Sequence, residues 1–363
     1  MADDVWLIGG KLVTPRGILP GAIRIVNGRI AAIRPRVPRD AKTLSVRGAY
    51  VAPGFIDLHV WGEPGAVSRE SARGGATAFL TTLGPEPPTQ LARDEAERAR
   101  AGPLPGAECL GLHLEGPFLN PIRGGVLPKR HMRSPSLSEL VRLWRASCGR
   151  LRLITLAPER PGALAAIRWC QRHRVVASLG HSDAELAEAV RAADAGASAV
   201  THIFNGMRPL HHRIPSLVDA ALTDVRLTAM VIADGVHVSA AALRLLLRAK
   251  GPERVALVTD SVRGERHRWK LRMRRGAFYA PDGTLAGSSL TMIGAVRNAV
   301  RLGGASLTDA VRMAAETPAR LLGLRDRGVL AVGKRADVVV FDGEYRVWLT
   351  IVNGQVVYQR EKR

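Results

Sequence analysis

The sequence predicts a (β/α)8 barrel of the TIM type together with a small β-sandwich domain that is built from both chain ends. Two observations carry this prediction. In the middle of the 363-residue chain, eight short apolar segments alternate with amphipathic helical patterns. Strands that alternate with helices form parallel sheets, and eight such units close a barrel. At both ends, short alternating strands with tight turns replace the helices.

The end segments share the motif IVNG, which predicts a hairpin turn in each. Asn27-Gly28 and Asn353-Gly354 both lie between apolar runs. Asparagine and glycine tolerate positive φ, as a two-residue hairpin turn requires. We therefore expect a small β domain from residues 1–51 and 326–363, flanking a barrel of residues 52–325.

The predicted barrel strands and helices follow one another in regular order. The strand segments are residues 54–60, 76–84, 108–117, 151–159, 175–182, 199–206, 228–235 and 255–262. Helical periodicity marks residues 136–147, 162–174, 183–196, 239–250, 293–304 and 306–324. In such a barrel the active site lies at the carboxyl ends of the strands, so we expect the catalytic residues among those that end each strand.

Composition excludes several classes of protein. The net charge is +21, but basic residues are scattered among acids, and only residues 263–275 form a dense basic run. No nucleic-acid motif accompanies that run, so nucleic-acid binding is not expected. No apolar run reaches the roughly 18 residues that a membrane span needs. The N-terminus lacks a signal-peptide pattern, and the three cysteines are odd in number and fit no zinc or redox spacing, so we expect a cytoplasmic protein with reduced thiols.

Metal-binding residues stand at the ends of several predicted strands. Glu115, His181 and His202 provide two imidazoles and one carboxylate, a set that zinc favours in hydrolases, with a position left open for water. Iron, cobalt and manganese also suit these ligands. Asp260, after the eighth strand, is expected to act as general base and acid on that water and on a leaving group. A helix cap or ion pair is the structural alternative for Asp260.

Seven motifs together resemble one family. PGFIDLH, GLHLEGPFLNP, GHSDA, THIFNGM, IADGVHV, LVTD and GTLAGSSLTMIGAV are similar to those of N-acetylglucosamine-6-phosphate deacetylases, which are members of the amidohydrolase superfamily. The resemblance implies that Glu115, His181 and His202 hold the metal and that Asp260 is the catalytic acid and base. It implies hydrolysis of N-acetylglucosamine 6-phosphate to glucosamine 6-phosphate and acetate in amino-sugar catabolism.

The same resemblance implies a phosphate site and a homodimer with shared active sites. Asn205 and the backbone amide of Gly206 match a pair that holds the sugar phosphate, and Arg213 matches the phosphate-binding arginine. His237 matches a histidine that reaches into the neighbouring subunit's site. Charge-assisted donors of these kinds hold phosphate strongly.

Three departures from the family's pattern bear on metal count and substrate. Where the superfamily often carries His-x-His, this chain has His59 and Trp61, so we expect one divalent metal ion per chain. His59 is expected to line the cavity or to support the metal site loosely, and whether it is a ligand stays open; His113 is expected to line the cavity. Leu127 stands where the family carries a histidine that faces the substrate, so we expect Leu127→His to raise activity. After Asp260 a basic run replaces small residues and proline.

Two further functions stay open beside this prediction. One is the same hydrolysis on another N-acylated amino sugar, either derived from galactosamine or unphosphorylated. The other is a decayed barrel that serves as a scaffold or binds polyanions through its basic surface. The intact set Glu115, His181, His202 and Asp260 argues against decay.

Overall fold

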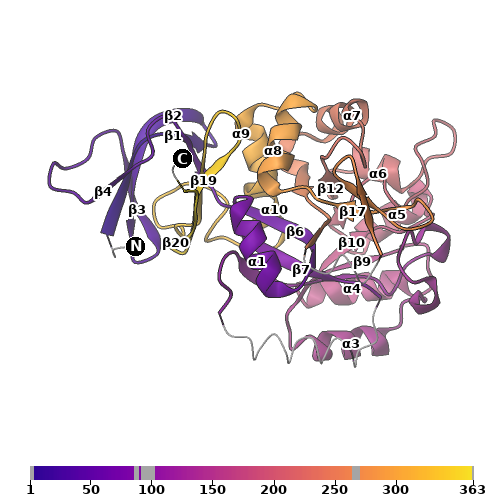
Figure 1. The fold of residues 1–363 in the computed structure, drawn as a ribbon. Coiled ribbons are helices and arrows are strands. Elements are labelled where there is room, and N and C mark those ends of the chain that lie inside the picture. Colours follow the sequence, from indigo (N-terminus) through magenta and orange to yellow (C-terminus); the bar gives the residue numbers. More distant parts are fainter. Residues whose placement is uncertain (1–3, 86–89, 91–102, 264–269, 362–363) are drawn as a thin grey trace.

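A computed structural model describes residues 4–85, 90, 103–263 and 270–361. Its strands form a twelve-stranded sheet, which is curled and surrounded by helices, and a separate eight-stranded mixed sheet. The eight-stranded sheet lies at one end of the molecule, and both chain termini lie beside it (Figure 1). Among the described residues, no helix is long and apolar enough to cross a membrane.

The barrel strands follow one another in chain order, each parallel to the next. They are β6 (Phe55–Gly62), β7 (Ala76–Leu83), β8 (Glu108–Glu115), β9 (Leu151–Leu156), β10 (Val176–Leu179), β11 (Ala199–Val200), β12 (Thr228–Ile232) and β13 (Val255–Val258). Each overlaps one of the eight segments that the sequence predicts, and β6 extends two residues beyond its segment. These strands are almost wholly buried, as expected of parallel strands that are covered on both faces.

The eighth predicted strand segment closes the barrel, because it pairs with both β12 and β6. Its first part, β13, pairs with β12, and its second part, β14 (Ser261–Arg263), pairs with β6. Between the two parts, the amide of Asp260 donates to the carbonyl of His59 at 2.9 Å. The break in the eighth strand therefore lies at Asp260, directly beside the end of the first.

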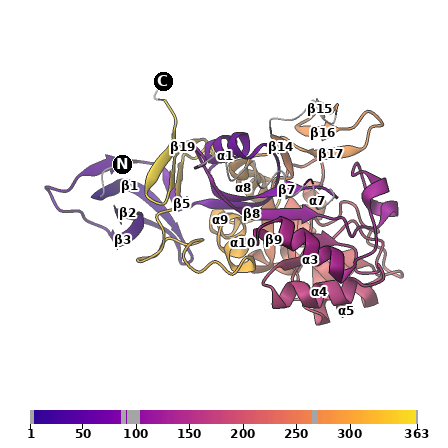
Figure 2. The same cartoon turned by 90° about the horizontal axis from the view of Figure 1, so that it is seen from below.

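A hairpin extends the sheet beyond β14. β17 (Leu285–Ser288) pairs with β14 and β16 (Ala277–Tyr279), and β15 (Arg272–Arg274) pairs with β16. Figure 2 shows these strands together at the end of the barrel that is remote from the terminal sheet. The basic run at residues 263–275 thus continues into an exposed strand, although residues 264–269 lie outside the described part of the chain.

Helices cover the outer face of the barrel (Figures 1 and 2). They are α1 (Pro64–Arg73), α3 (Leu137–Ala146), α4 (Ala163–Arg172), α5 (Leu186–Asp194), α6 (Leu217–Thr223), α7 (Ala240–Lys250), α8 (Met292–Arg301), α9 (Leu307–Ala314) and α10 (Glu316–Leu321). Every predicted helical segment overlaps at least one of them. Short 3-10 turns are η1 (Pro121–Arg123), η2 (Lys129–His131) and η3 (Pro252–Arg254). Serine or threonine caps several helices, for example Ser136 on α3 and Thr291 on α8.

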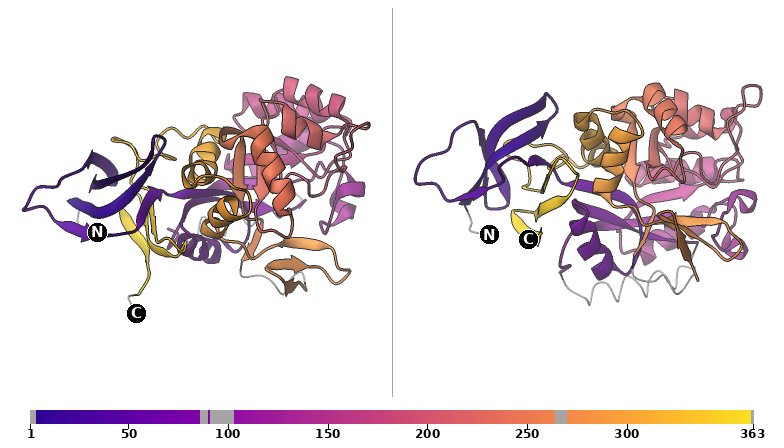
Figure 3. Two further views of the ribbon diagram at one scale, coloured as in Figure 1. Left: turned by 90° about the horizontal axis from the view of Figure 1, so that it is seen from above. Right: turned by 45° about the horizontal axis from the view of Figure 1, so that its top comes forward.

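Strands from both chain ends form the second sheet, as predicted. In the order in which they pair, they are β20 (Gln355–Gln359), β19 (Val347–Val352), β18 (Val338–Phe341), β5 (Tyr50–Pro53), β1 (Asp4–Thr14), β2 (Gly17–Val26) and β3 (Arg29–Arg34), with β4 (Thr43–Ser45) beside β1. The expected sandwich is found as one mixed sheet with an apolar core of its own. Figure 3 shows this sheet apart from the barrel in two further views.

Both predicted hairpin turns are confirmed. Asn27 and Gly28 join β2 to β3 with φ of 48° and 75°, and Asn353 and Gly354 join β19 to β20 with φ of 48° and 77°. The two turns also touch each other: a Cβ on Gly28 would lie 2.7 Å from the side-chain oxygen of Asn353. The repeated motif therefore forms one contact between the two chain ends.

Candidate active site

Five ionisable residues meet at the carboxyl ends of the barrel strands. His59 lies near the end of β6 and Glu115 ends β8, while His181, His202 and Asp260 directly follow β10, β11 and β13. The last three have φ of 46°, 30° and 47°. Residues other than glycine rarely adopt this left-handed backbone conformation, and those that do cluster at functional sites. The turn at each strand end directs its side chain toward the barrel axis.

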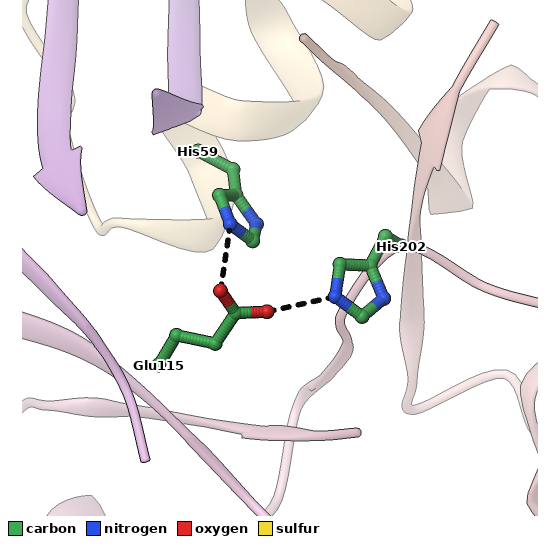
Figure 4. Close-up of side chains that lie close together, drawn as sticks. All are labelled: His59, Glu115 and His202. Atoms are coloured by element: carbon green, nitrogen blue, oxygen red, sulfur yellow. Dashed lines mark hydrogen bonds and ion pairs between the residues drawn. The ribbon is translucent and has the colours of Figure 1, made fainter. Parts of the chain in front are cut away.

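Glu115 is the centre of the cluster. Its Oε1 lies 2.9 Å from Nε2 of His181 and 2.8 Å from Nε2 of His202. Its Oε2 lies 3.3 Å from Nε2 of His59, which is also 3.3 Å from Oδ1 of Asp260. Figure 4 shows His59 and His202 facing opposite oxygens of the same carboxylate. Three imidazoles thus surround one buried carboxylate.

The buried carboxylates and imidazoles shift one another's ionisation. Burial lowers the pKa of His59, but Glu115 and Asp260 outweigh it and raise that pKa to about 9. Burial raises the pKa of Glu115, but the facing imidazoles hold it well below its usual range. Positive charge is therefore stabilised at the centre of this cluster, whether a proton or another cation supplies it.

The donor set fits a divalent metal ion. Nδ1 of His181 lies 2.7 Å from the carbonyl of Arg123, which can only accept, so this nitrogen donates. If the ring of His181 is neutral, its Nε2 carries no proton and turns a lone pair toward the carboxylate of Glu115. A cation between the two groups would satisfy both of these acceptors. The ligand atoms of His59, Glu115 and His202 lie within 4.8 Å of one another. His59, which sequence reasoning left open, belongs to this group.

Asp260 stands opposite Glu115 across His59, and a second neighbour holds its side chain. Its Oδ1 accepts a hydrogen bond from the indole Nε1 of Trp61 at 3.0 Å. From the sequence, Trp61 is expected only to remove a ligand from a second metal site. No signal in the sequence could show this contact, because the two residues are 199 positions apart.

His113 has a different place from the one predicted. Its Nδ1 donates to the carbonyl of Leu58 at 3.1 Å, and its Nε2 lies 2.7 Å from the hydroxyl of Thr155. Burial, with the nearby His59, holds its pKa well below the usual value. His113 and His59 are both 0% exposed, and neither lines the pocket. Both therefore lie behind the cavity wall, where His59 supports the cluster through Glu115 and Asp260.

Asp57 is a buried residue that sequence reasoning missed. Its Oδ1 accepts from the amides of His59 and Thr259, both at 3.2 Å, and its Oδ2 accepts from the hydroxyl of Thr259 at 2.6 Å. It thus fixes the backbone at the ends of β6 and β13, on either side of the cluster. The apolar run around Asp57 could have indicated it, since a buried carboxylate needs partners.

A cavity of about 210 Å³ opens onto the cluster. Polar lining residues are Glu115, His181, His202, Asn205, His237, Asp260 and Thr284; the remaining wall is formed by Trp61, Gly125, Val126, Leu127, Gly206, Val262, Leu271, Leu285, Ala286 and Gly287. Residues 284–287 belong to a motif that supported the resemblance but received no role. Much of the wall is apolar, so the few polar groups determine the orientation of a ligand.

His237, which the resemblance assigns to a site shared between subunits, lines the cavity of its own chain. Asp234 accepts from the amides of Val236 and His237 through Oδ1, both at 2.8 Å, and from Nδ1 of His237 through Oδ2 at 2.7 Å. This turn directs the imidazole inward. Burial lowers the pKa of His237, but the bond to Asp234 outweighs it and leaves that pKa raised.

Asn205 and Gly206 lie on the cavity wall, as predicted, whereas Arg213 does not. A Cβ on Gly206 would lie 2.8 Å from Nδ1 of His181, so only glycine fits against that ring. The side-chain nitrogen of Asn205 donates to the carbonyls of His202 and Ile203. Arg213 is exposed on the loop after β11, where its Nη1 lies 3.1 Å from Nε2 of His212.

Leu127 is 5% exposed and contributes to the apolar part of the wall. It belongs to a small cluster with Leu119 and Met132, against which Trp61 packs. Two of the three departures from the family's pattern, Trp61 and Leu127, are therefore in one group of contacting side chains.

Comparison with known proteins agrees with this arrangement. A model of the amidohydrolase family matches residues 50–357, which include the whole barrel and its strand-end residues. The chain belongs to the amidohydrolase family.

The resemblance to deacetylases is also confirmed by relatives that this amidohydrolase matches along nearly its full length. The N-acetylglucosamine-6-phosphate deacetylase of Bacillus subtilis (strain 168) is 33% identical, covering 99% of this chain and 98% of that protein. The N-acetylgalactosamine-6-phosphate deacetylase of Escherichia coli O157:H7 is 37% identical, covering 95% of this chain and 97% of that protein.

A solved structure has the same fold. It is a Mycobacterium smegmatis N-acetyl-D-glucosamine-6-phosphate deacetylase variant in complex with N-acetyl-D-glucosamine-6-phosphate. Its TM-score to this amidohydrolase is 0.88 at 33% sequence identity, and the match covers 99% of this chain and 100% of that one.

Proposed function

We propose that this amidohydrolase hydrolyses the N-acetyl group of N-acetylglucosamine 6-phosphate, producing glucosamine 6-phosphate and acetate for amino-sugar catabolism. The observation that carries the proposal is the cluster at the cavity floor, where three imidazoles surround Glu115 and Asp260 stands beside them. The full-length relatives that are named as deacetylases support the substrate class.

Glu115, His181 and His202, with His59 beside them, would hold one divalent metal ion per chain. Zinc is the metal that we propose, and iron, cobalt and manganese are the alternatives for such ligands. When bound, such an ion lowers the pKa of a water molecule and polarises an acyl carbonyl. The carbonyl of Arg123 fixes the orientation of the His181 ring for this role.

Asp260 would take a proton from the attacking water and return it to the departing amine of the sugar. Its contacts suit this role, because the backbone and Oδ1 are both held by neighbours while the residue lines the cavity. Losing a general acid and base of this kind costs about 10²–10⁴-fold in rate.

Asn205, Gly206 and His237 would bind the sugar phosphate within one chain's cavity. Arg213 lies outside that cavity on an exposed loop, so we propose that it completes the site of a partner in a homodimer. A protonated His237 and an arginine from the partner would supply two charge-assisted donors to the phosphate.

N-acetylgalactosamine 6-phosphate is the second candidate substrate. It is favoured by the relative of 37% identity, whose name specifies that sugar. The two sugars differ only in the orientation of one hydroxyl group, and this hydroxyl lies away from the acetamide that reacts.

Acetate release from a panel of N-acetyl sugars tests the proposal. The panel holds N-acetylglucosamine and N-acetylgalactosamine, each with and without a 6-phosphate, and Asp260→Asn is the matched control. We expect the phosphorylated glucosamine derivative to give the highest kcat/KM. A higher value on the galactosamine derivative would reassign the substrate. Salt-sensitive polyanion binding without turnover on any sugar would favour the scaffold alternative.

The domain division and location are part of the same proposal. Residues 1–51 and 326–363 would form one domain around residues 52–325, since the apolar core of the second sheet draws on residues 5–51 and 330–351. The three cysteines, all within the described residues, form no disulfide, in keeping with a cytoplasmic location.

A further inference from the structure

The indole of Trp61 reaches the carboxylate that we assign as the general base. Its Nε1 donates to Oδ1 of Asp260 at 3.0 Å. We propose that Trp61 is a positioning residue that fixes the Asp260 side chain for proton transfer. This inference rests on the proposed deacetylase function, because it concerns a residue of the same site.

The backbone of Asp260 is already fixed, so only its side-chain torsions remain to be set. Its amide donates to the carbonyl of His59 at 2.9 Å, and its carbonyl accepts from the amide of Ser288 at 2.8 Å. An indole N–H only donates, and it does not titrate in the range where proteins are folded. The bond from Trp61 therefore holds Oδ1 at any working pH, and a carboxylate held through Oδ1 presents Oδ2 for proton transfer.

Trp61 is itself held on three sides. Its backbone pairs with Val262 on β14 and with Thr82 on β7. Its ring packs against the cluster of Leu119, Leu127 and Met132. A Cβ on Gly84 would lie 3.6 Å from Cη2 of Trp61 and 3.8 Å from Cδ2 of Leu127, so ring edge and leucine methyl meet above this glycine. A donor that is locked by packing can set the geometry of its acceptor.

Two substitutions separate the N–H group from the ring. Trp61→Phe keeps an aromatic ring but removes the donor, whereas Trp61→Gln keeps an N–H donor but removes the ring. We expect kcat of Trp61→Phe to fall on the order of tenfold, as for the loss of a hydrogen bond to a charged group, with KM changed less than twofold. Trp61→Gln should retain a higher kcat than Trp61→Phe, and metal content should stay unchanged in both.

A matched control lies outside the cavity. The indole of Trp348 donates to Oδ2 of Asp342 at 3.3 Å on the terminal sheet, so Trp348→Phe removes the same kind of bond. This variant should keep the wild-type kcat. The proposal is overturned if Trp61→Phe stays within twofold of the wild-type kcat. It is equally overturned if Trp61→Gln falls further than Trp61→Phe, because the ring alone would then matter.

An indole resonance tests the contact without turnover. The chain has six tryptophans, and the peak that Trp61→Phe removes from a ¹⁵N–¹H spectrum of the metal-free protein identifies Trp61. Asp260→Ala should move this peak upfield and leave that of Trp348 in place. An unmoved Trp61 peak would refute the contact. A wild-type protein that releases no acetate would refute the proposed function, and the spectrum would then decide alone whether Trp61 holds Asp260.

Discussion

Asp260→Asn should abolish most turnover while leaving the fold and the metal site intact. The backbone of Asp260 has φ of 47°, a conformation that asparagine adopts more readily than most residues. The amide oxygen of asparagine can still accept the hydrogen bond from Nε1 of Trp61. The substitution therefore preserves shape and contacts but removes the ability to accept a proton.

The expected loss follows from that single change. Removing a general acid and base costs about 10²-fold or more, or roughly 3 kcal/mol in the activation free energy. The measurement is kcat for acetate release at saturating substrate, with metal content by elemental analysis and the thermal midpoint as checks. Metal content should stay near the wild-type value, since Asp260 is not among the proposed ligands.

Asp342→Asn is the matched control for this variant. Asp342 accepts from the indole of Trp348, so the same indole–carboxylate pair is altered outside the cavity. Its kcat should equal that of the wild type. An Asp260→Asn variant that keeps more than a tenth of the wild-type kcat would refute the assignment of Asp260 as the base.

Three other predictions test the metal, the dimer and the phosphate site. Elemental analysis should give about one divalent ion per chain, and His202→Ala should lose most of it; two fully occupied ions would contradict a mononuclear site. Arg213→Ala and His237→Ala should each impair activity alone. A mixture of the two variants, with subunit exchange confirmed, should regain activity, because one site of each heterodimer then has both residues intact. KM for a phosphorylated sugar should rise as pH rises through the raised pKa of His237, and Asp234→Asn should bring this rise to lower pH. The His237–Asp234 pair contributes its full stability between the ordinary pKa of Asp234, 3.8, and that of His237, 6.5, and this stability is lost as pH rises through the raised pKa of His237. A KM that does not depend on pH would count against protonated His237.

The barrel and the strand-end residues could be predicted because both follow from local patterns. Apolar runs of strand length, interrupted by helical periodicity, give the order of parallel strands. Parallel strands bring their carboxyl ends to the same face, so Glu115, His181, His202 and Asp260 had to lie near one another. Likewise, Asn-Gly between apolar runs specifies a hairpin through its backbone preference alone.

The places of His113 and His237 depend on contacts that the motifs alone do not show. His113 lies near the end of its strand, close to Glu115, yet a carbonyl from β6 and a hydroxyl from β9 take up both ring nitrogens. His237 points into its own cavity because Asp234 caps the preceding turn. Neither contact produces a periodic pattern in the sequence. A motif alone therefore could not show which of these residues lines the cavity.

The sequence suggests that Leu127→His would raise activity by supplying a hydrogen bond to the substrate, but the packing around Leu127 leads us to predict the opposite. Leu127 is 5% exposed and packs with Leu119, Met132 and Trp61, so a histidine there would bury a polar ring among apolar side chains. The usual cost is about 1–3 kcal/mol, and the loss of packing would loosen the ring that holds Asp260.

We therefore expect Leu127→His to lower both the thermal midpoint and kcat/KM while Trp61 is present. Leu210→His, at a leucine that is 47% exposed, should leave both unchanged and serves as the control. In a Trp61→Gln background the ring is gone, so the same change at residue 127 should cost less. Contacting residues of this kind couple by about 0.5–3 kcal/mol in a double-mutant cycle. A rise in kcat/KM for Leu127→His alone would mean that residue 127 acts on the substrate directly and not through Trp61.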